Sequence, residues 1–471
     1  MTQARRSRNQ RRGRSPHPVP LPIGREEGAR RAGEGCYETF AQPVKTLLDN
    51  SKKTFVGFGF GPIQSALFLY EAFRSGRFSR FVIAEVDAGI VQAVRSAAGR
   101  YTINIALPDR IEQAAISGVE LCNPAVPEDR QQILQAIAHS DELATSLPSV
   151  AFYDTGGHTS VARTLADGLA LRTAPRPTII YTAENHNHAA ELLREAVAKY
   201  CPPAALQSVQ FLNTVIGKMS GVITDPATLA RLNLAKMTPA IPKAVLVEEF
   251  NRILISQIAL PGFTRGIEVF IEKPDLLPFE EAKLYGHNAI HALIGYLAAR
   301  RGLAAMSDAA AHPDIMATAR AAFLDESGVA LIRKHAALGD PLFTPAGYAA
   351  YADDLLARMI RPTLNDLIAR VTRDPVRKLG YDDRFFGAMR LALSSGVRPA
   401  NLARGAAAAV LSLLEQWDSL GSAVARLPRP TPPASHQSVD RLLRAIWPVN
   451  SGPEAATLID LVWEALDHLG Q

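Results

Sequence analysis

Cysteine is scarce in this sequence. Its 471 residues include three, Cys36, Cys122 and Cys201, which are far apart and form no CxxC pair. This spacing excludes a disulfide-dense secreted scaffold and argues against a structural zinc site, whose ligands usually come in close pairs. We therefore expect no metal, and the reducing cytoplasm is the location that fits this cysteine content.

Long apolar runs are also missing. No stretch of about 18 uncharged apolar residues is present, so the sequence predicts no membrane span, and no apolar signal core follows the basic start of the chain. A hydrophobic fraction of 47% over 471 residues is nevertheless enough for large cores. The sequence therefore predicts a globular protein of two or three domains.

Acidic residues are nearly missing from positions 1–31, which hold nine arginines but only two acids, Glu26 and Glu27. The net charge of the whole chain is +5, so the remainder of the chain is left near −2. Because the basicity belongs to a tail, we predict no nucleic-acid partner. Prolines between Pro16 and Pro22 keep this tail extended, and we expect residues 1–50 to be disordered and dispensable for chemistry.

A glycine turn follows an apolar segment that begins at Thr54. Gly59, Gly61 and Gln64 give G-x-G-x-x-Q, one glycine short of the dinucleotide-binding fingerprint. The first two glycines serve the tight turn and the approach of the backbone to a pyrophosphate, whereas the third mainly allows close helix packing. A strand, a nucleotide-binding turn and a helix that starts around Ile63 are therefore predicted.

Glu85 lies at the end of a second predicted strand, residues 81–87. An acidic residue at this position accepts hydrogen bonds from the adenosine ribose, and a carboxylate there repels a 2′-phosphate. We therefore expect NAD rather than NADP as the cofactor. The alternative for Glu85 is an ordinary surface charge at a strand end.

Further strands are predicted at 150–156 and 177–185, each followed by a polar loop and a helix. This repetition indicates an α/β fold, with a doubly wound Rossmann-type sheet over residues 51–225 and a mainly helical domain over 226–471. Catalysis is expected in the cleft between the two domains. Thr155 and Gly156 are placed to line the cofactor near its nicotinamide end.

The segment 278–297 predicts a helix with four hydrogen-bonding side chains on one side. At about 100° per residue, these four fall within an arc of roughly 140°; they are Glu280, Lys283, Asn288 and His291. A lysine among apolar neighbours loses hydration, and its pKa then moves toward neutrality, where it can act as a general base. Polar residues on a solvated outer face are the alternative interpretation.

The spacing of Lys283, Asn288 and His291 resembles the signature of the polyol-specific long-chain dehydrogenases, over about residues 54–420. The resemblance implies a metal-independent secondary-alcohol dehydrogenase in which Lys283 is the general base. Asn288 would stabilise the alkoxide, as would Asn185 at the end of a strand. His291 would position substrate hydroxyls, and Glu280 would gate a proton path to solvent.

Two segments refine the resemblance. Where the family usually has an Asp-Arg pair, this chain has Gly217 and Lys218. The segment 361–384 resembles the phosphate-using branch of the family through a basic pattern, whose members are Arg370, Arg373, Arg377 and Lys378. Arginine suits bidentate phosphate binding, although a solvated basic helix end is the alternative.

Three functions follow from these patterns. The leading one is an NAD-dependent enzyme that interconverts a polyol phosphate and a ketose phosphate, mannitol 1-phosphate and fructose 6-phosphate. The second is a dehydrogenase of free polyols or hexuronates. The third is a catalytically silent sugar- or nucleotide-binding protein, which Gln64 and Gly217 make conceivable. No obligate protein partner is evident from the sequence.

Overall fold

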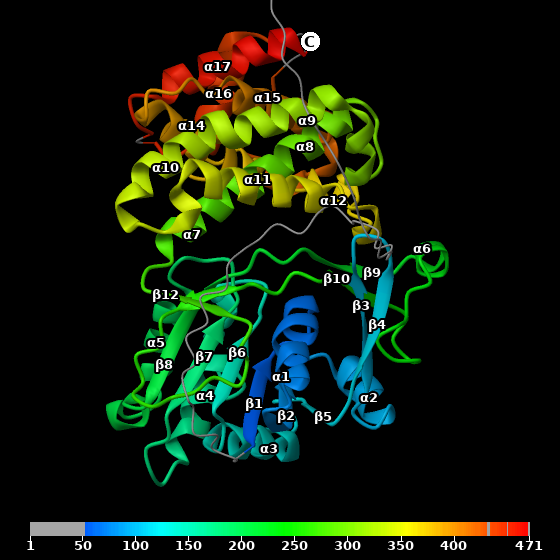
Figure 1. Ribbon diagram of the computed structural model, residues 1–471, viewed down its shortest axis with the longest axis vertical. Coiled ribbons are helices and arrows are strands. Elements are labelled where there is room, and N and C mark those ends of the chain that lie inside the picture. Colours follow the sequence, from blue (N-terminus) through cyan, green and yellow to red (C-terminus); the bar gives the residue numbers. More distant parts are fainter. Residues whose placement is uncertain (1–51, 431–433, 450, 470–471) are drawn as a thin grey trace, which may run out of the picture. The chain divides into compact units, whose positions relative to one another are not determined.

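The computed structural model describes residues 52–430, 434–449 and 451–469, so the predicted tail lies outside the described residues. Residues 51–471 form one compact unit. Within that unit a parallel sheet with flanking helices comes first in the chain, and a helical region follows it (Figure 1).

The larger sheet has eight strands, in the order β12-β11-β8-β7-β6-β1-β2-β5. Six of them are mutually parallel and follow the Rossmann strand order; they are β1 Lys53–Phe58, β2 Phe78–Ala84, β5 Val119–Cys122, β6 Glu142–Thr145, β7 Thr178–Thr182 and β8 Val209–Val215. β11 (Leu254–Ser256) runs antiparallel to β8, and β12 (Ile271–Lys273) extends the edge. The predicted doubly wound sheet is confirmed.

Alternate strand residues pack on opposite faces of this sheet, as the pleat requires. Phe55 and Ile83 belong to one apolar core, whereas Val56 and Val82 belong to another. The segments that flank the sheets are η1 Gln64–Phe68, α1 Leu69–Ser75, α2 Ala88–Ser96, α3 Pro127–Ala138, α4 Val161–Ala170, α5 Ala189–Ala198, η3 Pro203–Leu206 and α6 Pro226–Arg231.

The prediction of a strand at 150–156 is wrong. The strand is β6, and Val150–Phe152 form the 3₁₀ helix η2 instead. Pro148 cannot donate to a strand ladder, and the Ser149 hydroxyl accepts a hydrogen bond from Ala151 N, at 3.3 Å, which starts the helical turn. A buried strand of four residues shows no alternation by which it could be recognised in the sequence.

A second sheet of four strands has no counterpart in the sequence prediction. Its order is β4-β3-β10-β9, and the strands are β3 Tyr101–Ala106, β4 Ile111–Ile116, β9 Ser220–Ile223 and β10 Ala244–Glu248. β3 pairs in parallel with β10, a partner far along the chain. The domain boundary predicted at 225/226 stays a prediction, and β10, β11 and β12 lie beyond it.

The predicted helical region begins at Leu277 and packs around one large apolar core. Its elements are α7 Leu277–Glu281, η4 Ala282–Asn288, α8 Ala289–Arg300, η5 Met306–Ala311, α9 Pro313–Ala321, η6 Ala322–Gly328, α10 Val329–His335, η7 Ala336–Leu338, η8 Pro341–Phe343, α11 Pro345–Met359, η9 Pro362–Leu364, α12 Ile368–Val371, α13 Pro375–Lys378, α14 Arg384–Ser394, α15 Ala400–Glu415, η10 Trp417–Ser419, η11 Gly421–Ala423, α16 His436–Ile446 and α17 Ala455–His468. α8 and α15 lie in the middle of this core and are buried along most of their length.

A buried ion pair joins the helical region to the second sheet. Arg358 of α11 donates from Nε and Nη2 to the Glu248 carboxylate of β10, at 2.8 and 2.6 Å. The Arg358 side chain is 5% exposed and that of Glu248 is fully buried. Arg358 also donates to the Gly217 carbonyl at 2.7 Å and lies 3.9 Å from the ring centroid of Phe250. These contacts fix α11 against the second sheet.

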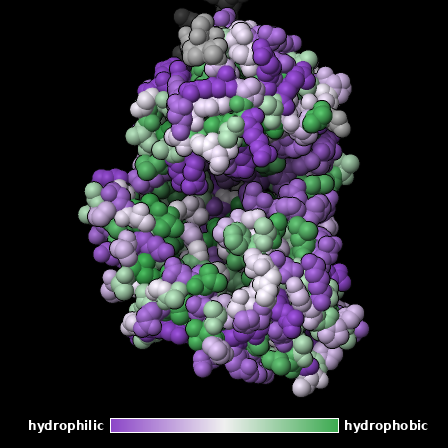
Figure 2. Space-filling view, turned by 180° about the vertical axis from the view of Figure 1, so that it is seen from behind, coloured by the Kyte–Doolittle hydropathy of each residue, from purple (hydrophilic) through white to green (hydrophobic). Residues whose placement is uncertain are grey.

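The surface shown in Figure 2 carries hydrophobic side chains in small groups among hydrophilic ones. Within the part of the chain that the structure describes, no helix combines the length and the apolar character needed to cross a membrane.

Candidate active site

The predicted helix over 278–297 is present, but its interior is not regular. α7, η4 and α8 follow one another without a break, and η4 is a π-helix, with its wider turn. The predicted arc assumed the α-helical angle throughout. Glu280, Lys283 and Asn288 face one pocket, whereas His291 bonds to a residue outside that pocket's lining.

This pocket lies at the carboxyl ends of β7 and β8, the edge at which ligands bind in doubly wound sheets. Its volume is about 50 Å³. The lining comes from residues 183–187, residues 214–216 and the catalytic helix, which contributes Glu280, Lys283, Leu284 and Asn288. The structure therefore brings together four of the five predicted catalytic residues, Asn185 included.

Lys283 is half-buried, and its Nζ donates a hydrogen bond to Asn185 Oδ1 at 3.2 Å. Loss of hydration lowers the pKa of Lys283 to about 8; the charge of Arg384 lowers it further, and that of Glu280 opposes the shift. A lysine with this pKa can gain or lose a proton near neutral pH, which is what a general base requires.

Glu280 lines the same pocket as this lysine. Burial raises the pKa of Glu280 to about 7, against the lowering effect of Lys283. Against the effect of burial, Glu280 in turn raises the pKa of Lys283, so each charge favours the charged form of the other group. The pocket therefore contains a carboxyl group and an amine that both exchange protons near neutrality.

Glu184, which precedes Asn185, is a functional candidate that the sequence reasoning missed. Its buried carboxylate accepts hydrogen bonds from Thr145 Oγ1 at 2.9 Å, from Leu147 N at 2.8 Å and from the Tyr153 hydroxyl. Burial raises the pKa of Glu184, against these hydrogen bonds. Glu184 thus fixes the end of β7 to the loop after β6 and holds Asn185 at the pocket. An acid directly after a buried strand was the available signal.

His291 belongs to a separate polar chain. Its Nε2 lies 2.8 Å from Asp366 Oδ2, and Asp366 Oδ1 accepts from Nε and Nη2 of Arg370 at 2.9 and 2.7 Å. Although burial opposes it, contacts with His291 and Arg370 hold the pKa of Asp366 below its usual range. Asp366 lies four residues before Arg370 and was not predicted as a site residue.

The remaining predicted bases do not line the Lys283 pocket. Arg377 pairs with Asp374 and Asp383, at 2.7 and 3.2 Å. Lys378 is buried, and its Nζ donates to the carbonyls of Val371, at 2.8 Å, and of Arg373. Burial, with the charges of Arg384 and its basic neighbours, lowers the pKa of Lys378 to about 7. The Arg373 side chain is exposed.

The glycine turn has the geometry that a dinucleotide needs. Gly59 has a φ of +83°, and a Cβ there would lie 2.7 Å from the Ser146 carbonyl oxygen, so glycine is required. At Gly61 no heavy atom lies within 4 Å of the Cβ position, which leaves the backbone open to a ligand. The helix start at this turn therefore fits a pyrophosphate.

Gln64 occupies the position of the third glycine, and the structure explains how it is accommodated. The Gln64 side chain is fully buried over Gly57 of β1, where a Cβ would lie 2.1 Å from the Gln64 amide nitrogen. Gly57 thus supplies the space that a glycine at 64 would have supplied. Ile63, one residue earlier, is half-buried at the start of the helix.

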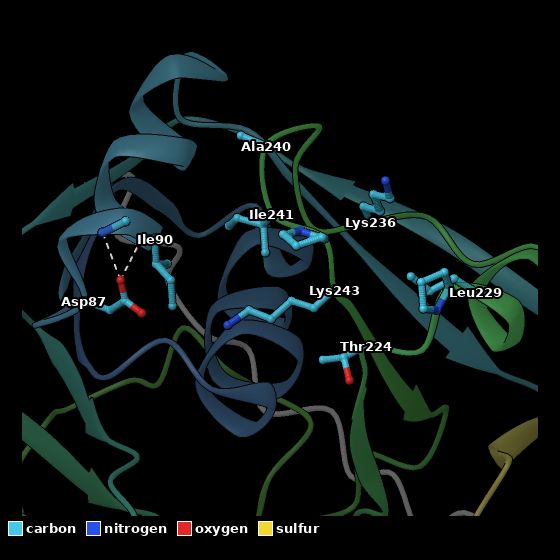
Figure 3. A pocket seen from close by; sticks show the side chains of 11 residues that line it. Asp87, Ile90, Thr224, Leu229, Lys236, Ala240, Ile241 and Lys243 are labelled. Atoms are coloured by element: carbon cyan, nitrogen blue, oxygen red, sulfur yellow. Dashed lines mark hydrogen bonds between the residues drawn. The ribbon is translucent and has the colours of Figure 1, made fainter.

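Glu85 directly follows β2, and Asp87, two residues later, lines a larger pocket. One oxygen of the Glu85 carboxylate accepts from Asp87 N at 2.8 Å, and Asp87 in turn caps α2. This pocket has a volume of about 530 Å³, and its lining combines apolar residues with Asp87, Thr224, Lys236 and Lys243. Figure 3 shows Lys243 pointing toward the side of Asp87 and Lys236 pointing away. Glu85 itself is not part of this lining, and its contact with a ribose stays a prediction.

The loop that contains Thr155 and Gly156 is exposed and connects η2 to α4. Asp154 orders its start by accepting from the Tyr200 hydroxyl at 2.9 Å. His186 and His188 are exposed beside the pocket. Residues 52–430, 434–449 and 451–469 contain no group of three or more His, Cys, Asp or Glu side chains arranged to hold a metal ion.

Comparisons with known proteins agree with this geometry. Residues 275–427 match the family model of the mannitol dehydrogenase C-terminal domain. The mannitol-1-phosphate 5-dehydrogenase of Bacillus licheniformis is 29% identical over 336 residues, covering 70% of this chain and 80% of that protein. That of an Arthrobacter species is 31% identical over 278 residues, covering 57% and 65%.

Two solved structures share the fold. A substrate-free D-sorbitol dehydrogenase superposes with a TM-score of 0.69 at 14% identity, covering 89% of this chain and 93% of that one. The ternary complex of Pseudomonas fluorescens mannitol 2-dehydrogenase with NAD and D-mannitol gives 0.64 at 14% identity, covering 89% and 92%. The Rossmann-type sheet and the lysine pocket agree with these similarities, and residues 275–427 match the mannitol dehydrogenase C-terminal domain.

Proposed function

We propose that this protein is an NAD-dependent dehydrogenase that interconverts a polyol phosphate and a ketose phosphate, mannitol 1-phosphate and fructose 6-phosphate. The observation that carries the proposal is the half-buried Lys283, bonded to Asn185 and with its pKa lowered to about 8. The names of the relatives, mannitol-1-phosphate 5-dehydrogenases, support the choice of substrate.

The residues of the pocket divide the chemistry among them. NAD, when bound, accepts the hydride from the carbinol carbon. Neutral Lys283 accepts the proton of the reacting hydroxyl, and the amides of Asn185 and Asn288 donate hydrogen bonds to the oxygen as negative charge develops on it. Glu280, with a pKa of about 7, passes the proton from Lys283 to solvent.

The cofactor would be held at the glycine turn. Gly59 and Gly61 allow the pyrophosphate to approach the backbone, and Ile63 and Gln64 begin the helix beneath it. Glu85 would accept hydrogen bonds from the adenosine ribose. Thr155 and Gly156 would line the nicotinamide end.

The phosphate would be bound by the basic segment, through Arg370, Arg373, Arg377 and Lys378. The exposed guanidinium of Arg373 supports this role. A dehydrogenase of free polyols or hexuronates is the second candidate, because Asp366 pairs with Arg370 and two acids pair with Arg377. We retain the cytoplasm as the proposed location.

A substrate panel tests these proposals. The full chain would be incubated with NAD and with matched phosphorylated and free polyols, and NADH formation would be followed by absorbance. We expect mannitol 1-phosphate to give the highest kcat/KM. A higher kcat/KM for free mannitol, or for a hexonate in the hexuronate-forming direction, would reject the phosphate assignment in favour of the second candidate.

Replacement of the Glu85 carboxylate should alter cofactor choice. In the unmutated protein NAD is expected to be preferred, because the carboxylate repels a 2′-phosphate, and Glu85→Ala should narrow that preference. The ratio of kcat/KM for NAD and NADP measures the effect. Equal or better use of NADP by the unmutated protein would contradict the assignment of Glu85.

A further inference from the structure

His287 lies on the catalytic helix, between two predicted catalytic residues. Its ring centroid is 6.3 Å from that of His291, and besides burial the charge of Lys283 lowers its pKa, so His287 lies near both residues. His287 is not part of the lining of the Lys283 pocket, and neither the sequence pattern nor the mechanism above uses it.

The imidazole of His287 is neutral and has hydrogen-bonding capacity left over. Burial holds its pKa well below the usual range, and the nearby charges of His291, Arg358, Lys283 and Arg384 act in the same direction. A neutral imidazole has one N–H donor and one acceptor nitrogen. Among the described residues we find no hydrogen-bond partner for either nitrogen, while 7% of the residue stays exposed.

The backbone opposite His287 leaves room for a ligand atom. A Cβ built on Gly217 would lie 4.0 Å from His287 Nδ1 and 3.8 Å from the ring of Phe250, with no closer neighbour. The Gly217 carbonyl is already used, since it accepts a hydrogen bond from Arg358. The buried side-chain nitrogens and oxygens that lack a partner in the described part of the chain do not include those of His287, so its ring nitrogens keep contact with solvent, and a bound hydroxyl would replace that contact.

We propose that His287 is a specificity-determining residue that hydrogen-bonds one hydroxyl of the polyol whose reacting carbon lies at Lys283. The proposal rests on the function proposed above and adds a recognition contact to it. His291 and Lys283 already have partners, in Asp366 and Asn185, whereas His287 does not. His287 therefore selects the polyol by a hydrogen bond to one hydroxyl group and takes no part in proton transfer.

A binding cycle tests this contact. In the NAD complex of Lys283→Met, substrate can bind without reacting, so calorimetry gives the Kd of mannitol 1-phosphate and of each of its monodeoxy analogues. Adding His287→Leu should weaken binding of the full polyol by about 5- to 100-fold, the loss expected for an unpaired buried hydroxyl. For one analogue, the one that lacks the contacted hydroxyl, the effect of His287→Leu should disappear.

Conservative variants separate recognition from packing. His287→Gln keeps a donor and an acceptor and should restore most of the affinity, and His139→Leu, at an exposed histidine after α3, should leave every Kd unchanged. A change in Kd below about twofold, or the same loss for all analogues, would overturn the proposal. Because binding is measured without turnover, a protein that oxidises no polyol would refute the proposed function while the cycle still decides the role of His287.

Discussion

Lys283→Met is expected to lower kcat for polyol oxidation by at least about two orders of magnitude, because general-base catalysis typically contributes 10²- to 10⁴-fold. Methionine nearly matches lysine in shape but cannot accept the proton. The affinity for NAD should change little, since the glycine turn and Glu85 lie away from the Lys283 pocket lining. Steady-state kinetics and NAD titration by fluorescence measure the two effects separately.

The pH profile provides the internal check on Lys283. Oxidation needs the neutral amine, so the rate should rise with pH and level off above about 8, and ketose reduction should show the opposite trend. Glu280→Gln removes the charge that raises the pKa of Lys283, so the midpoint should move to lower pH. If Lys283→Met keeps most of its kcat and an unchanged profile, Lys283 is not the base. Absence of turnover on all polyols, with NAD bound, would favour the silent binding protein.

Arg358→Met is expected to destabilise the fold by about 3–5 kcal/mol, because it removes the guanidinium that neutralises the fully buried Glu248 carboxylate and leaves, among the described residues, only the hydrogen bond from Met219 N. Thermal unfolding followed by circular dichroism should show a clear fall in Tm. Arg320→Met is the matched control: Arg320 pairs at 3.1 Å with Asp353 of α11, and both side chains are more than half exposed. Loss of such a surface pair should change stability by no more than about 1 kcal/mol.

A double variant identifies the source of the loss. Adding Glu248→Gln to Arg358→Met removes the buried charge, so part of the lost stability should return. If Arg358→Met unfolds no earlier than the Arg320→Met control, the ion pair does not fix the helical region to the second sheet.

The Rossmann sheet could be predicted because its signals are local. An apolar run before Gly59 and another before Glu85 each correspond to a buried parallel strand. The catalytic helix was equally visible in its apolar periodicity. Its π-helical interior was not, because the change from one hydrogen-bond register to another leaves no residue pattern. This change explains why the predicted arc did not hold for His291.

Features that depend on distant partners could not be predicted. β3 and β10 form the centre of the second sheet, yet nothing in either segment specifies the other. The basic segment was predicted from the spacing of its cations. The sequence pattern did not show that Arg377 forms ion pairs with Asp374 and Asp383. Glu184 was overlooked because burial of an acid is a tertiary property.

The two sheets also determine the order in which the chain can fold during synthesis. Strand β3 ends at Ala106, and its neighbour β10 begins only at Ala244. One edge of β8 can pair only after β11 has been synthesised, and β12 completes this side of the sheet at Lys273. The chain loses conformational entropy when such long loops close, before strand pairing stabilises the sheet. Contacts between residues far apart in sequence therefore slow folding. A nascent chain that already contains the whole nucleotide-binding turn therefore still exposes unpaired strand edges. We expect this interval, before Lys273 has left the ribosome, to be the stage most dependent on chaperones.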